Sequence, residues 1–187
     1  MKRVKRQLTG GGLYQKTTLP NGMRVVSERI PGIRSISVGI WVDVGSRHES
    51  PPESGLSHYI EHMVFKGTKR RTARQIADSL ESIGGSLNAF TTRENTCFTA
   101  RILDEHLPQA MDVLADITCH PTMSRTNLIR EGMVICEEIK ESLDNPADHV
   151  HDLFARTFWG EQPLGQPIMG TIDNIRQMTR RRMLEYK

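Results

Sequence analysis

The sequence lacks most features of secreted, membrane-spanning and disulfide-stabilised proteins. Its three cysteines, Cys97, Cys119 and Cys136, are odd in number and far apart, and no C-x-x-C pair occurs. A disulfide framework is therefore not expected, and a reducing compartment fits best. No apolar run approaches the roughly 20 residues that a helix needs to span a bilayer.

Address signals are missing as well. Residues 1–7 are basic, but no apolar stretch follows them, so they do not form a secretory signal. Three glycines at 10–12 leave this segment too short for a convincing amphipathic transit peptide. We therefore expect a cytoplasmic protein, with the mitochondrial matrix as the alternative.

Aromatic residues are scarce, at 5%, and the formal net charge is only +3. Basic residues cluster at 2–6, 69–74 and 180–182, where solvated surface or helix ends are the expected reading. Aromatic residues are not interleaved with these clusters, and no nucleic-acid-binding module is recognisable. We predict neither nucleic acid nor a membrane as a partner.

Strand and helix patterns alternate along the 187 residues, which suffice for one domain with a sizeable core. This order predicts an α+β fold, with a mostly antiparallel sheet and helices packed on one face. Residues 1–12 are expected to be a flexible lead-in, and 13–187 to form a single domain. The predicted elements are a hairpin across Pro20-Asn21-Gly22, a strand at 35–44, helices at 55–65 and 72–83, a hairpin at 86–91 and 96–103, and helices at 107–118, 124–143, 146–159, 171–178 and from 179.

The predicted helix at 55–65, with Ser54 as its N-cap, carries His58-Tyr59-Ile60-Glu61-His62. Residues four apart share a helix face, so His58 and His62 lie one above the other, with Glu61 toward the same side. Two imidazoles are half of a zinc site, and a neighbouring carboxylate can act on zinc-bound water. With seven histidines and thirteen glutamates, chance alone gives this H-x-x-E-H pattern in roughly 2% of such chains. A surface helix remains an open alternative on spacing alone.

A catalytic zinc site needs a third protein ligand. In the predicted helix at 124–143, Glu131 and Glu138 are two turns apart and share one stripe, whereas Glu137 points away. Glu141 lies at the edge of that stripe, where a solvated position is expected. If this helix packs against the motif helix, Glu138 can be the third ligand and Glu131 a group that supports the ligands or handles protons.

Several segments together resemble one known family. Residues 58–68 are similar to the zinc-site signature of the pitrilysin-type metallopeptidases, and within them to bacterial processing-protease homologues and the catalytic subunit of the mitochondrial processing peptidase. Further similar segments lie in the same order at 19–25, 85–91, 134–139 and 164–171, and the likeness runs from about Tyr14 to the end.

The resemblance implies zinc-dependent endoproteolysis of extended peptides. It implies His58, His62 and Glu138 as zinc ligands, Glu61 as the base that activates water, and Glu131 as a further catalytic glutamate. It also implies that the strand Asn88, Ala89, Phe90 and Thr91 pairs with the substrate backbone. Without the resemblance, an ordinary strand is the preferred reading of these four residues.

Length is the one departure from the family pattern. Family members resemble two homologous halves, and this chain matches only the first, with a further strand expected soon after Lys187. We therefore expect a fragment of a longer protein, or a part that needs a second homologous half-domain from a partner. A non-catalytic peptide-binding or scaffold subunit is the competing function, although such relatives usually have a degraded zinc motif and this one is intact.

Overall fold

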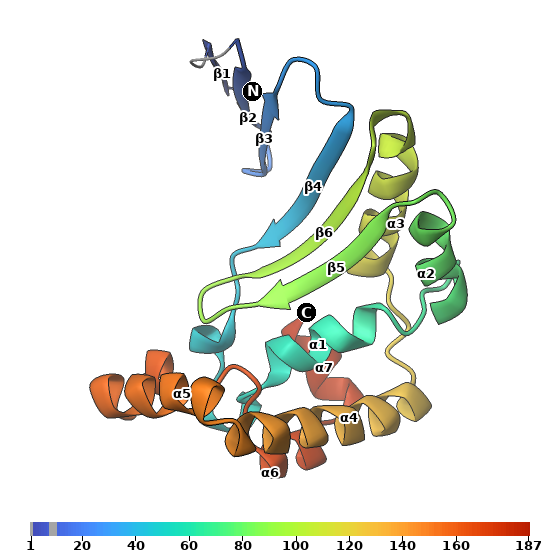
Figure 1. Ribbon diagram of the computed structural model, residues 1–187. Coiled ribbons are helices and arrows are strands. Elements are labelled where there is room, and N and C mark those ends of the chain that lie inside the picture. The colour runs from blue at the N-terminus through green and yellow to red at the C-terminus, as the bar shows by residue number, and fades with distance from the viewer. Residues whose placement is uncertain (1, 8–10) are drawn as a thin grey trace. The chain divides into compact units, whose positions relative to one another are not determined.

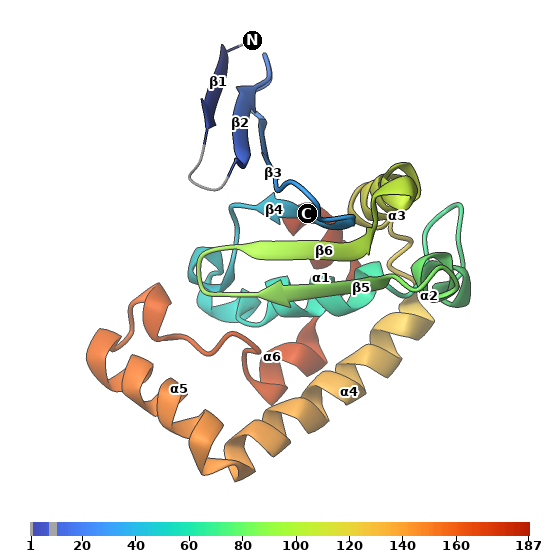
Figure 2. The ribbon, with the colours of Figure 1, turned by 45° about the horizontal axis from the view of Figure 1, so that its top comes forward.

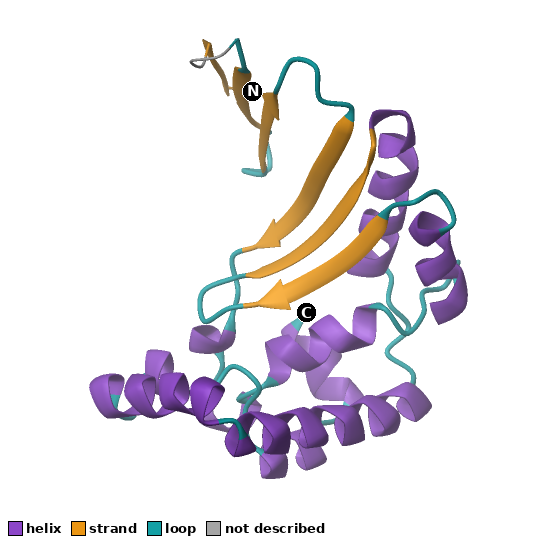
Figure 3. Cartoon of the chain, in the orientation of Figure 1, coloured by secondary structure: helices purple, strands orange, loops and turns teal. Residues whose placement is uncertain are grey.

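The computed structural model describes residues 2–7 and 11–187, and the elements below refer to these residues (Figures 1 and 3). The strands are β1 (Lys2–Gln7), β2 (Leu13–Thr18), β3 (Arg24–Arg29), β4 (Ser35–Val42), β5 (Ser86–Thr91) and β6 (Thr96–Leu103). The α-helices are α1 (Leu56–Val64), α2 (Ala73–Glu81), α3 (Leu107–Cys119), α4 (Arg125–Asp144), α5 (Pro146–Trp159), α6 (Ile172–Gln177) and α7 (Arg180–Tyr186). Most of the predicted elements are thus confirmed, with ends shifted by a few residues.

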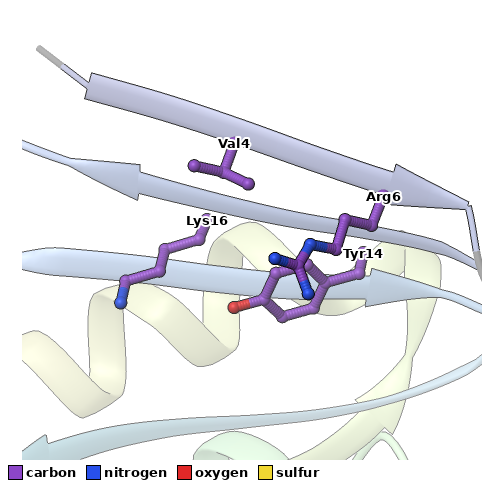
Figure 4. A pocket seen from close by; sticks show the side chains of 4 residues that line it. All are labelled: Val4, Arg6, Tyr14 and Lys16. Carbon is purple, nitrogen blue, oxygen red and sulfur yellow. The ribbon is translucent and has the colours of Figure 1, made fainter.

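The chain divides into two compact units, residues 1–36 and 37–187. The first unit holds the antiparallel sheet β1-β2-β3. The predicted hairpin is confirmed: β2 and β3 flank a turn in which Gly22 has a φ of +87°. Cross-strand pairing places Val4 opposite Lys16 and Arg6 opposite Tyr14, and these four side chains line a hollow of about 460 Å³ (Figure 4).

The beginning of the chain differs from the sequence expectation. Within the predicted flexible lead-in, Lys2–Gln7 forms a strand that pairs with β2 along its whole length, while residues 8–10 lie outside the described residues. Its one apolar residue, Val4, gives no alternating pattern, so backbone pairing with β2 decides its conformation.

In the second unit, the sheet has the strand order β4-β6-β5. Alternate residues of β6, namely Phe98, Ala100 and Ile102, are buried. Helices α1 and α2 contact β5, and α3 contacts β6 (Figure 1). On the opposite face, the exposed rings of Trp41 and Phe90 meet edge to face with centroids 5.6 Å apart. The predicted α+β class, antiparallel with helices on one face, is confirmed.

The long helix α4 lies across α1 and continues through Asn145 into α5 (Figure 2). Its N-cap is Ser124, whose hydroxyl accepts a hydrogen bond from the backbone NH of Asn127. None of the helices in the described part of the chain is both long and apolar enough to cross a membrane.

Close contact between α1 and α4 depends on Gly132. A Cβ at this position would lie 2.5 Å from Tyr59 Oη, well inside van der Waals contact. Tyr59 is only 1% exposed and donates a hydrogen bond to the carbonyl oxygen of Leu128, so its ring has little room to move. The lack of a side chain at Gly132 therefore allows the motif helix to approach the glutamates of α4 closely.

We expect Gly132→Ala to lower the free energy of unfolding by about 1–3 kcal/mol, because the added methyl overpacks the α1–α4 contact. The measurement is denaturant unfolding of the wild type, Gly132→Ala, Tyr59→Phe and the double variant. Removing the Tyr59 hydroxyl makes room for the methyl, so the double variant should be more stable than the sum of the two single effects predicts. Additive losses would contradict this account of the contact.

Candidate metal centre

The N-cap of the motif helix α1 is Gly55, whose φ of +94° suits glycine, and not the predicted Ser54. The buried carboxylate of Glu49 caps the helix from outside it. It accepts hydrogen bonds from the backbone NH of Gly55 at 2.7 Å and of Ser57 at 2.6 Å. Burial raises the pKa of Glu49, while these hydrogen bonds act in the opposite direction. The prediction that Ser54 caps the helix was wrong, because the capping carboxylate belongs to Glu49, six residues before Gly55.

His58, His62 and Glu138 converge where α1 crosses α4. Glu138 Oε2 lies 3.4 Å from His62 Nε2 and 4.0 Å from His58 Nε2. One potential ligand atom from each residue lies within 4.8 Å of the other two, and within residues 2–7 and 11–187 no other group of three His, Cys, Asp or Glu does this. The structure therefore brings together the three residues that were predicted to bind zinc.

This donor set fits a zinc ion. Four ligands at bond lengths of about 2.1 Å in a tetrahedron lie roughly 3.4 Å from one another. The separations from Glu138 Oε2 to His62 Nε2 and His58 Nε2, 3.4 Å and 4.0 Å, are compatible with this arrangement. Burial, together with the neighbouring His62, lowers the pKa of His58 to about 4. His58 is therefore neutral near pH 7, which is the protonation state that coordinates a metal.

Glu131 lies behind His62, away from the three converging atoms. Its Oε2 is 3.4 Å from His62 Nδ1, and its Oε1 is 2.9 Å from the ammonium of Lys66. With the proton on Nδ1, His62 donates to Glu131 and keeps Nε2 free toward Glu138. The predicted catalytic residue Glu131 thus contacts a predicted ligand, an arrangement that orients the imidazole ring.

Glu61 lies next to this group and is held by β5. Thr91 Oγ1 donates a 2.6 Å hydrogen bond to Glu61 Oε2. Burial raises the pKa of Glu61, the hydrogen bond from Thr91 and the charge of His62 lower it, and Glu138 raises it; the net direction is upward. A carboxylate with a raised pKa is a better proton acceptor near neutral pH than an ordinary glutamate.

A cleft of about 330 Å³ opens beside His58 and Glu61. Of the four predicted substrate-binding residues, Ala89, Phe90 and Thr91 line it, whereas Asn88 does not. The remaining lining comes from segments to which the sequence interpretation gave no role: Asp152, Ile168 and Met169. Asp152 is paired with Arg93 at 3.1 Å, which ties α5 to the turn between β5 and β6.

The contacts of several residues near the site were not predicted from the sequence. Lys66 stands inside the similar segment at 58–68, but only its contact with Glu131 reveals a partner. Glu49 and the hydroxyl of Thr91 make hydrogen bonds to residues elsewhere in the chain, at Gly55 and Glu61. Sequence spacing alone does not predict these contacts. Glu137, predicted to point away, is exposed and pairs with Lys140 at 2.7 Å.

Comparisons with known proteins identify the family of the chain. Residues 24–172 match the Insulinase (Peptidase family M16) family, and the chain belongs to that family. An uncharacterized zinc protease of Streptomyces coelicolor is 44% identical over 95% of this chain and 39% of its own length. An uncharacterized zinc protease of Bacillus subtilis is 47% identical over 87% of this chain and 40% of its own length.

Two further relatives extend the comparison. A probable mitochondrial-processing peptidase subunit beta of Arabidopsis thaliana is 42% identical over 91% of this chain and 32% of its own length. The crystal structure of a protease from Helicobacter pylori superposes with a TM-score of 0.86 at 26% identity, over 92% of this chain and 42% of that one. The chain thus spans about 40% of the length of the first two relatives, and the predicted family resemblance is confirmed.

We expect Glu131→Gln to weaken zinc binding about 10- to 100-fold, because the neutral amide no longer fixes and polarises the His62 ring. The measurement is competition for Zn²⁺ between the purified protein and a chelating dye.

The matched control is Glu137→Gln, which makes the same change on the exposed side of α4. It should leave zinc affinity unchanged. Equal affinities for Glu131→Gln and the wild type would remove Glu131 from the support of the metal centre.

Proposed function

We propose that this chain is the metal-binding half of a zinc-dependent endopeptidase that cleaves extended peptides. The observation that carries the proposal is the convergence of His58, His62 and Glu138 beside Glu61, at the wall of a cleft. Membership of a peptidase family and relatives named zinc proteases support the same reading.

In this proposal His58, His62 and Glu138 hold one zinc ion, which when bound lowers the pKa of water and polarises a peptide carbonyl. Glu61 takes a proton from the attacking water and later passes it to the leaving amine nitrogen. Glu131, paired with Lys66, keeps the His62 ring oriented. Of the side chains with a role in this proposal, His58 and Glu61 line the cleft.

The proposed substrate is an extended peptide that lies along β5. This strand is at the edge of the order β4-β6-β5, and an edge strand can pair with an added strand through its backbone. Ala89, Phe90 and Thr91 line the same cleft as His58 and Glu61, which supports this placement. For Asn88 we propose a part in strand pairing only, since its side chain is outside the cleft lining.

We further propose a second homologous half-domain as partner, in the same longer chain or in another subunit. The share of the relatives' length that this chain spans supports this. The domain assignment of 13–187 as the zinc-binding part, the exclusion of nucleic acid and membrane as partners, and the cytoplasmic location with its mitochondrial alternative stay predictions.

The test is Glu61→Gln in the full-length protein. We expect it to retain one zinc per chain, because the three ligands are untouched, and to lose cleavage of an unstructured peptide by at least about 100-fold. Zinc content is measured by elemental analysis, and cleavage by mass spectrometry of the products.

The control Glu141→Gln alters an exposed glutamate of α4 and should cleave like the wild type. Full cleavage by Glu61→Gln would remove Glu61 as the base. A wild-type protein that binds zinc and peptide without cleaving it would instead favour the non-catalytic peptide-binding subunit.

A further inference from the structure

The hydroxyl of Thr91 links the proposed base to the proposed substrate strand. Thr91 is the last residue of β5, and its Oγ1 donates the 2.6 Å hydrogen bond to Glu61 Oε2. Glu61 belongs to α1, thirty residues earlier, so this contact joins the motif helix to the sheet.

We propose that Thr91 is a positioning residue: its side chain holds the Glu61 carboxylate in the orientation that takes the proton, and thereby couples the strand β5 to the base. This inference rests on the proposed function, and it gives Thr91 a role in addition to backbone pairing with a peptide.

A glutamate side chain such as that of Glu61 is free to rotate unless it is held by a partner. Glu61 has three rotatable bonds, and its carboxylate could turn toward His62 or away from Glu138 under the charges around it. A hydrogen bond to an ionised carboxylate is among the stronger side-chain interactions and restricts this rotation. Because the bond engages Oε2, Oε1 remains available to accept the proton.

The position of Thr91 in β5 explains how this strand is coupled to Glu61. Thr91 pairs with Thr96 in the register of β5 and β6, so its backbone is fixed by the sheet. Its two predecessors, Ala89 and Phe90, line the cleft with it. A peptide that pairs with β5 would therefore touch the same short strand that orients the base.

The experiment compares Thr91→Val with Thr91→Ser in the full-length, zinc-loaded protein. Valine keeps the shape and the strand preference of threonine but lacks the hydroxyl, whereas serine keeps the hydroxyl. The readouts are kcat and KM for an unstructured peptide, zinc content, and affinity for that peptide measured in the Glu61→Gln background, where it is not cleaved. Thr99→Val makes the same change on β6 at a residue outside the cleft lining.

We expect Thr91→Val to lower kcat about 10- to 100-fold, the scale of a misplaced catalytic group, with KM within about threefold of the wild type. Zinc content and peptide affinity should not change. Thr91→Ser should recover most of kcat, and Thr99→Val should behave like the wild type.

Three results would overturn the inference: Thr91→Val with an unchanged kcat, Thr91→Ser as impaired as Thr91→Val, or an effect confined to KM and peptide affinity. The last would assign Thr91 to peptide binding alone. Failure of the proposed function is distinguishable, because the wild-type protein would then lack zinc or cleavage before any change at Thr91.

Discussion

The close packing of α1 on α4 is the constraint on which the candidate metal centre depends. It places two histidines of one helix opposite two glutamates of the other, although some 70 residues of sequence separate them. The glycine at 132 lets Tyr59 approach the α4 backbone, and Asn127 fixes the end of the motif helix through a 2.8 Å hydrogen bond to the carbonyl of Lys66. A few contacts therefore convert a spacing pattern into three converging donor atoms.

The buried carboxylates near the α1–α4 contact, Glu131 and Glu49, both have hydrogen-bonding or ion-pair partners. Glu131 is shared between His62 and Lys66, and Glu49 accepts two backbone NH groups at the start of α1. An unpaired carboxylate in such surroundings would be costly, so these contacts stabilise the fold while they orient the site. Glu61 also has a partner: its carboxylate accepts a hydrogen bond from Thr91, which belongs to the strand that borders the cleft.

Local patterns predicted much of the fold. Thr72 and Ser124 cap the helices that their sequences indicated, and the hairpin of β5 and β6 has the predicted bounds. Patterns failed where distant residues decide: the strand Lys2–Gln7 forms by pairing with β2, and Glu49 replaces Ser54 as the cap of α1. In α4, the apolar residues Ile129, Val134 and Leu143 are exposed, while Glu131 is buried, because the helix turns its acidic stripe toward α1.

The sequence predicted the three residues that converge in the candidate site and, in Glu131, one group that contacts them, but not the remaining supporting residues. His58, His62 and Glu138 follow from helix spacing together with the family resemblance, but the partners Lys66 and Thr91 depend on tertiary contacts.

Whether His58, His62 and Glu138 bind zinc is tested most directly by the X-ray absorption spectrum of the zinc-loaded protein at the zinc edge. We expect nitrogen and oxygen ligands at about 2.0–2.2 Å, with the scattering of two imidazoles. A sulfur ligand at about 2.3 Å, or fewer than two imidazoles, would contradict it.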